Sequence, residues 1–307
     1  MEKDNKEGAI LPMEPHIQLE QIYGLQFPES LFTFWEFVQS HVSLFALLEM
    51  SLQGPFDILK GISQDEGNAL WAARCYNDPP EFLTLASGHS DGYHWGYYID
   101  DPQNPAFPVA AFYSHDAFEI TVVGETLFEA ARYVLELFYR DNLSYLQSDP
   151  GYEQSYEEKL NQLASLRSAL QAYETVERQE VGSHYLRKYV PRRQAYPMTR
   201  DGMGIVVPAK SYVPIDEHDP FQLGNYVPGE KDVRKNATKA IKLLEQGYPG
   251  AALKLGKDLW IYKEFRETSY ALLEAAYAAL KRDRLREWLK VAIAYRQACE
   301  AKWNSEE

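Results

Sequence analysis

The spacing of apolar residues changes along this chain, and the change predicts where helices give way to strands. Between about residues 28 and 52, apolar positions recur every three or four residues, which is typical of amphipathic helices. Two helices are predicted there, over Pro28–Ser40 and Leu44–Leu52. Between Phe82 and Gly124 the period shortens and Gly, Pro and Asp recur, which predicts short strands joined by tight turns. The predicted strands are Phe82–Ser87, His94–Ile99, Val109–Ser114 and Glu119–Val123.

A helix is predicted to follow these strands, and helices dominate the rest of the chain. Thr126 is expected to cap a helix that reaches about Tyr139 with its apolar face on the sheet. A polar, turn-prone stretch around Asp149 and Pro150 follows, so we predict a domain boundary between residues 145 and 146. The expected later elements are a helix over Tyr152–Glu177, a strand over Gly204–Val207, and helices over Asp232–Gln246, Ala251–Ile261, Phe265–Lys281 and Arg284–Trp303.

The predicted fold class is therefore α+β. Residues 1–18 are expected to be a flexible N-terminus, because they are polar and lack periodicity. Residues 19–145 are expected to form an antiparallel meander flanked by helices. Residues 146–307 are expected to form a mainly helical domain with a short strand region.

Composition and charge argue against several classes of function. The chain has 307 residues, of which 45% are hydrophobic, and no apolar run approaches the ~20 residues that span a bilayer. The N-terminus lacks a basic region leading into an apolar stretch, so we expect a soluble, cytoplasmic protein that does not act on membranes. The formal net charge of −14 disfavours direct DNA binding. The same charge suits a basic partner surface, or serves solubility alone.

The sequence contains no motif of a common self-contained active site. It has no Gly-x-Ser-x-Gly elbow, no phosphate-binding Walker loop and no His-Glu-x-x-His. Cys75 and Cys299 lie far apart, without Cys or His at metal-ligand spacing, so no metal, disulfide or cofactor is predicted. Residues 185–200 interleave basic residues with tyrosines. That cluster is compatible with phosphate or nucleic-acid binding, or with a strand pair that has a charged solvent face.

Several motifs, taken together, resemble the histone PARylation factor family. Its members are accessory proteins that complete the active site of poly(ADP-ribose) polymerases. The resemblance covers about residues 19–295 and is that of a divergent, bacterial-type homologue. The motifs that carry it are Gly54–Leu59, Tyr76–Phe82, Gly92–Pro102, Leu25–Phe37, Met203–Pro208 and Leu253–Trp260.

The resemblance implies where catalytic residues would lie. In the family, two adjacent carboxylates precede the motif that here is Leu253–Trp260, and the second is the base that deprotonates a serine hydroxyl on the target protein. Counting back assigns these positions to Glu245 and Gln246. An amide oxygen is far too weak a base for that step. A slip of one residue in this assignment would place Glu245 at the base position.

A second family feature is a tyrosine and an arginine that engage the polymerase. Their positions correspond here to Asp216 and Glu217, and this acidity opposes the same contact surface. The N-terminal motifs also contain Trp95, Tyr97 and Tyr98, which are candidate pocket residues. We favour a structural role for these motifs, in which Gly and Pro set turns and Asp57, Asp78 and Glu81 satisfy loop amides.

The leading functional hypothesis is an accessory interaction protein that assists an ADP-ribosyltransferase-like partner, rather than a self-contained enzyme. One alternative is a stand-alone enzyme that handles ADP-ribose or NAD, with Glu245 as acid or base beside a cation such as Lys254 or Arg266. Another alternative treats the N-terminal part as a protein-binding module that resembles the toxin-immunity superfamily. These three hypotheses differ in whether Glu245 meets a partner protein, a small ligand or neither.

Overall fold

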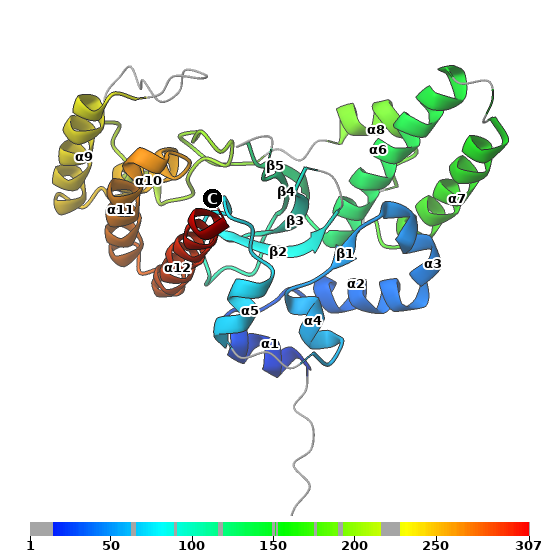
Figure 1. The fold of residues 1–307 in the computed structure, drawn as a ribbon, viewed down its shortest axis with the longest axis horizontal. Helices are drawn as coiled ribbons and strands as arrows, with labels where there is room; N and C mark the ends of the chain where they lie inside the picture. The colour runs from blue at the N-terminus through cyan, green and yellow to red at the C-terminus, as the bar shows by residue number, and fades with distance from the viewer. Residues whose placement is uncertain are drawn as a thin grey trace, which may run out of the picture.

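The computed structural model describes residues 15–62, 66–88, 91–115, 119–148, 151, 153–174, 177–189, 193–215 and 228–306. A five-stranded antiparallel sheet lies at its centre, with helices on both sides (Figure 1). The strands follow one another in sheet order, so the predicted meander and the α+β fold class are confirmed. The strands are β1 (Ser51–Leu52), β2 (Phe82–Ser87), β3 (Tyr93–Tyr98), β4 (Val109–Tyr113) and β5 (Thr121–Gly124).

The larger core contains buried residues from helices in the first two thirds of the chain and also from the C-terminal helices. Successive residues of a strand point to opposite faces, so Trp95 and Tyr97 of β3 share this core. Phe34 packs edge-on against Trp95, with ring centroids 6.1 Å apart. The helices are α1 (Pro15–Tyr23), α2 (Glu29–Ser40), α3 (Val42–Phe45), α4 (Pro55–Leu59), α5 (Glu66–Ala72), α6 (Leu127–Ser148), α7 (Glu153–Gln171) and α8 (Gly182–Lys188).

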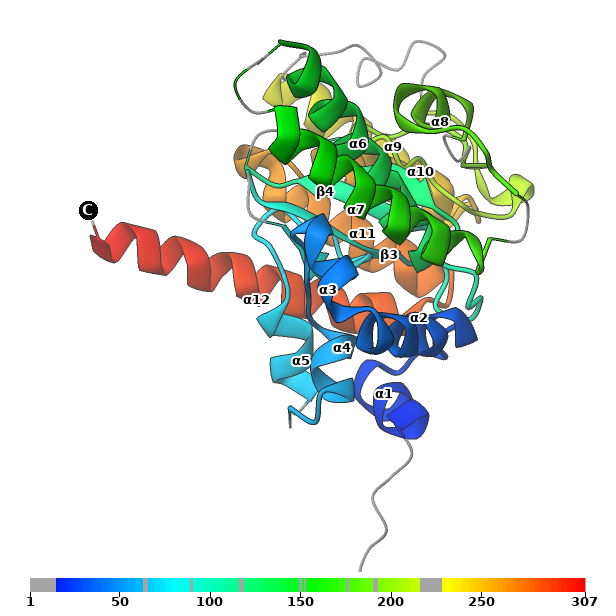
Figure 2. The same cartoon turned by 90° about the vertical axis from the view of Figure 1, so that its right-hand side faces the viewer.

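Four further helices lie on the opposite side of the sheet from α6 and α7 (Figure 1). They are α9 (Glu230–Glu245), α10 (Pro249–Leu259), α11 (Arg266–Ala279) and α12 (Asp283–Glu306). All eleven residues of α10 are buried, and α12 extends away from the rest of the molecule (Figure 2). A Cβ atom on Gly256 would lie 2.9 Å from the side chain of Leu273, so glycine allows α10 to pack closely on α11.

Several predicted elements have different bounds in the structure. The helix expected over Leu44–Leu52 ends early, because Glu49 adopts a left-handed conformation with φ of 53°, and Ser51–Leu52 pairs with β2 as β1. None of the described helices is alone long and apolar enough to cross a membrane. The bent pair Glu29–Ser40 and Val42–Leu48 meets that test only when both parts are combined.

The region after the meander also differs from expectation. α6 runs to Ser148, past its expected end at about Tyr139, and α1 begins at Pro15, within the segment expected to be flexible. The division into domains stays a prediction. A strand pair within residues 181–200 is wrong for Gly182–Lys188, which forms α8. The backbone N–H of this helix's first residue donates to Oε2 of Glu136 at 2.6 Å, a contact from α6 that fixes the local path.

In place of a regular strand over Gly204–Val207, the structure has an extended segment. Ile205 donates its backbone N–H to the carbonyl of Pro197 at 3.1 Å and accepts one from Tyr196 at the same distance. Met203, next to this segment, packs with Tyr98 and Phe112 on the second face of the sheet. Residues 199–206 therefore lie between the sheet and the C-terminal helices.

Candidate functional site

The turn between α9 and α10 holds the two positions that the family resemblance selects. Glu245 is the last residue of α9 and Gln246 follows it, and both side chains are exposed. Gly247 has φ of 92°, and Tyr248 donates its N–H to the carbonyl of Leu243 at 2.8 Å. This is the hydrogen-bond pattern of a glycine-terminated helix, so the backbone of the turn has one defined conformation.

The helix that follows anchors this turn to the body of the protein. Pro249 occupies the first turn of α10, where the missing N–H costs nothing. Gly250 packs so closely on Ser211 that a Cβ atom would lie 2.9 Å from its carbonyl oxygen. Near the other end of α10, Asp258 accepts from Lys254 at 2.5 Å and from the backbone N–H of Arg200 at 2.9 Å. The exposed pair is therefore presented by a fully buried helix.

A groove between α9 and α11 begins at Glu245. Its floor is apolar, with Val233, Ile241 and Phe265 among the lining residues, and its volume is about 820 Å³. Its rim carries both signs of charge, with more acids than bases. The charged lining residues are Glu230, Glu245, Glu264, Glu267, Arg234 and Lys242.

The cations that a stand-alone enzyme hypothesis requires lie elsewhere. Lys254 is buried and paired with Asp258. Arg266 is paired with Glu300 and donates to the hydroxyl of Tyr76. In the described part of the chain, neither side chain lines the groove that contains Glu245. The structure thus gives Glu245 no contact with the two cations named for that hypothesis.

The aromatic candidates are not gathered at one site. Trp95 and Tyr97 are buried in the larger core, whereas Tyr98 faces the C-terminal half. The Tyr98 hydroxyl donates to Oδ2 of Asp201 at 3.4 Å. The guanidinium of Arg193 and the ammonium of Lys257 lie 5.0 and 4.9 Å from the centre of the Tyr98 ring. Tyr98 also lines a cavity of about 250 Å³. Asp216 and Glu217 lie outside the described residues.

The described part of the basic and aromatic cluster makes internal contacts. Arg193 is paired with Asp100, and Lys188 is paired with Glu180. The guanidinium of Arg200 lies 5.2 Å from the centre of the Tyr262 ring. These contacts give Lys188, Arg193 and Arg200 partners within the protein, which differs from both expectations for the cluster, a nucleic-acid site and a strand pair with a charged solvent face.

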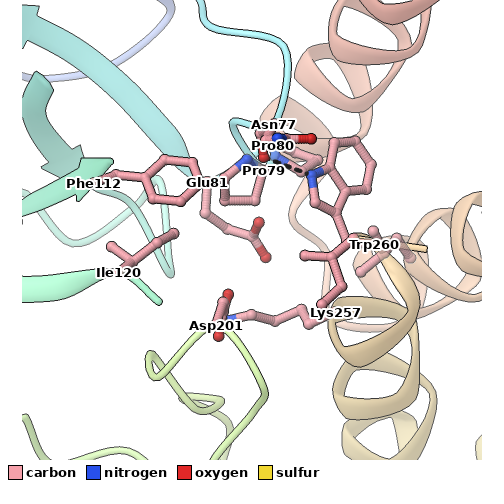
Figure 3. Close-up of a pocket in the computed structure, with 11 residues that line it drawn as sticks. Asn77, Pro79, Pro80, Glu81, Phe112, Ile120, Asp201, Lys257 and Trp260 are labelled. Atoms are coloured by element: carbon pink, nitrogen blue, oxygen red, sulfur yellow. Dashed lines mark hydrogen bonds and ion pairs between the residues drawn. The ribbon is translucent and has the colours of Figure 1, made fainter. Parts of the chain in front are cut away.

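Sequence reasoning missed a polar cavity between the sheet and α10. The carboxylates of Glu81 and Asp201 and the side chain of Lys257 converge there (Figure 3). The Tyr277 hydroxyl donates to Oε1 of Glu81 at 2.6 Å, while Oε2 has no hydrogen-bond partner among the described residues. Lys257 donates to the carbonyl of Gly204 at 2.6 Å and lies 3.7 Å from Asp201. The cavity volume of about 10 Å³ is roughly what one water molecule needs.

The chemistry of Glu81 follows from its burial. Desolvation raises its pKa above the ordinary value, and this effect exceeds the lowering by the charge of Lys257 and by the Tyr277 hydrogen bond. Asp57 and Asp78 bind backbone N–H groups of Gly54 and Cys75, as predicted for loop acids. Glu81 differs, since its carboxylate accepts from a side-chain hydroxyl on a helix 196 residues later. No local signal in the sequence could reveal that contact.

Comparison with known proteins gives a consistent result across most of the chain. The sequence model described as Histone PARylation factor 1 matches residues 14–296. The Bos taurus protein named Histone PARylation factor 1 is 26% identical over 332 aligned positions, which cover 96% of this chain and 91% of that protein. The Mus musculus protein of that name is 27% identical over 304 positions, covering 87% and 82%. The Danio rerio protein of that name is 31% identical over 140 positions, covering 42% and 39%.

Proposed function

Because the chain belongs to the Histone PARylation factor 1 family, we propose that it is an accessory protein that docks on an ADP-ribosyltransferase and presents the α9–α10 turn to that partner's active site. The position of Glu245 and Gln246 supports this proposal most strongly. Both are exposed, adjacent and held by a buried helix within the span that the family model matches. Such a placement suits a group that must enter another protein's site in a fixed geometry.

The chemistry of the pair defines what this accessory protein contributes. Gln246 provides a hydrogen-bond donor and acceptor but cannot take a proton from a serine hydroxyl at neutral pH. Glu245 is the carboxylate of this turn, and it points from the end of α9 toward solvent and the α9–α11 groove. We therefore propose that partner binding is retained and that base catalysis from position 246 is absent.

The test is direct binding between the purified full-length chain and the ADP-ribosyltransferases encoded in the same genome, measured by isothermal titration calorimetry. Gln246→Arg places a bulky cation on the proposed contact surface and should weaken binding at least about tenfold, which corresponds to ~1.4 kcal/mol. Glu287→Arg on α12 is the control, because Glu287 is also exposed, at 57% of its side-chain area, and lies on a different helix.

Two outcomes would overturn the proposal. One is that the chain binds none of these transferases. The other is that Gln246→Arg and Glu287→Arg bind as tightly as the natural chain, which would move the docking surface away from the turn. An unchanged circular-dichroism spectrum is required of both variants, so that a loss of binding is not a loss of fold.

A further inference from the structure

Three side chains with metal-binding atoms meet beside strands β2 and β3. Cys75 lies in the loop after α5, Asp78 in the turn before β2, and His94 in β3. Their ligand atoms, a thiol sulfur, a carboxylate oxygen and an imidazole nitrogen, all lie within 4.8 Å of one another. His94 comes 16 residues after Asp78 and lies on β3, which pairs with β2. The sequence therefore contains no compact metal-binding motif that includes all three residues.

The hydrogen bonds around this group orient its ligand atoms toward one another. Nδ1 of His94 lies 2.7 Å from the carbonyl oxygen of Gly92, which can only accept, so Nδ1 carries a hydrogen and Nε2 faces Asp78. Oδ2 of Asp78 accepts from the N–H of Cys75 at 2.8 Å and from the hydroxyl of Thr84 at 3.2 Å. Its other oxygen, Oδ1, is left facing Nε2 of His94 at 2.8 Å. Histidines that bind metals are commonly oriented in this way by a backbone carbonyl.

From this arrangement we infer that Cys75, Asp78 and His94 form a binding site for a zinc ion. One sulfur, one nitrogen and one oxygen are the donors that Zn²⁺ accepts in proteins, and three protein ligands leave a fourth position for water. A thiolate and a carboxylate balance the two positive charges of the ion. Magnesium and calcium prefer sites made of oxygen ligands, so they are poor candidates.

The dimensions and the access route suit this ion. Zinc bonds of about 2.0–2.3 Å in a tetrahedron separate the ligand atoms by roughly 3.3–3.7 Å. Oδ1 of Asp78 and Nε2 of His94 must therefore move apart by about half an ångström, and zinc replaces the proton that they share. The side chains of Asp78 and His94 are fully buried, whereas Cys75 is half-buried and gives the ion a path from solvent.

The positive charge of the neighbouring Arg74 makes the thiolate of Cys75 and the carboxylate of Asp78 both necessary for binding zinc. Arg74 is buried and donates to the carbonyl oxygens of Asp78 and Pro79 at 3.3 and 3.2 Å, so it fixes the turn that carries Asp78. Its positive charge opposes a second cation nearby. Losing the thiolate of Cys75 should thus lower zinc affinity sharply, at least about 100-fold, beyond the 10- to 100-fold typical of changes around the ligands.

The experiment uses the full chain, treated with a chelator and dialysed, and Co²⁺ as a spectroscopic substitute for zinc. We expect one Co²⁺ per chain, a near-ultraviolet charge-transfer band from the thiolate–cobalt bond, and displacement of Co²⁺ by Zn²⁺. Cys75→Ser should abolish the band and the tight binding. Cys299→Ser is the matched control, since Cys299 is also half-buried and is not a member of the ligand group.

Three results would contradict the proposed zinc site or its ligands. If the natural chain shows no charge-transfer band at a tenfold excess of Co²⁺, the site does not exist. If Cys75→Ser keeps the band, or Cys299→Ser loses it, the ligand set is wrong. Asp78→Asn supplies a second test of the ligand set, and zinc should raise the thermal unfolding temperature of the natural chain but not of either ligand variant.

Discussion

Replacing Glu81 by Gln should stabilise the protein at neutral and alkaline pH. The substitution keeps an oxygen that accepts from the Tyr277 hydroxyl, at 2.6 Å in the natural chain, and removes a buried negative charge. The new amide nitrogen replaces Oε2, which has no hydrogen-bond partner in the described structure, and faces the space that Asp201 also lines (Figure 3). The perturbation therefore changes charge with little change in shape.

The size and the pH dependence of the effect follow from burial. Burying an ionised carboxylate costs desolvation free energy that a neutral amide largely avoids, so we expect Glu81→Gln to gain about 1–3 kcal/mol. The folded-state pKa of Glu81 is raised by desolvation, so the stability that Glu81 contributes is fully present below its unfolded pKa of about 4.3. It is lost as pH rises through the folded pKa. The advantage of the glutamine variant should therefore grow with pH.

The assay is thermal unfolding followed by circular dichroism, for both proteins between pH 5.5 and 8.5, which stays above the sequence pI of about 5.0. For a chain of 307 residues, a gain of about 2 kcal/mol should raise the unfolding temperature by roughly 3 °C. Tyr145→Phe, which alters a tyrosine that is 54% exposed, is the control for a change remote from the cavity. A variant that is less stable than the natural chain at pH 8.5, or a difference that stays constant with pH, would refute the reasoning.

Three further predictions test other parts of the structure. Tyr277→Phe should lower the free energy of unfolding in urea by about 1.5–3 kcal/mol in the natural chain, where the lost hydrogen bond is to a charged carboxylate. The loss should be smaller in a Glu81→Gln background, where the bond is to a neutral amide, and equal losses would contradict this reasoning. Gly256→Val should lower the free energy of unfolding by at least about 1–3 kcal/mol, because α10 packs closely on α11 there. Gly229→Ala is the control and should change stability little, because the nearest atom to an added Cβ would be 3.5 Å away. Gln246→Glu, assayed with a transferase that binds the chain, should increase serine ADP-ribosylation by at least about 100-fold, and no increase would exclude position 246 as a base position.

Elements fixed by neighbouring residues in the sequence were predicted, whereas elements fixed by contacts with distant parts of the chain were not. β2 was predicted with its observed bounds, because the short, mostly apolar run Phe82–Ser87 and the flanking turns are local signals. The two-residue strand Ser51–Leu52 was missed, since only its pairing with β2 makes it a strand. The helix Gly182–Lys188 was missed for a similar reason, because its N-terminus is fixed by Glu136 of another helix.

The candidate sites were likewise harder to predict where their residues come from distant parts of the chain. Glu245 and Gln246 were found through a family resemblance, and the structure places both at one exposed turn. Glu81 was noticed as part of a motif, but its partners Lys257 and Tyr277 come from distant helices, so its environment could not be inferred. The grouping of Cys75 with His94 likewise depends on the position of β3 beside β2.

The full burial of α10 has a consequence for how chemistry can change within this family. Since the helix holds the turn without using the side chain at position 246, that side chain is free to vary while the fold stays the same. Glutamine and glutamate codons differ by a single base, so one nucleotide substitution exchanges an amide for a carboxylate at this point. Loss or recovery of a proton acceptor would then be an easily reversible evolutionary step, and overall sequence identity would carry almost no record of it.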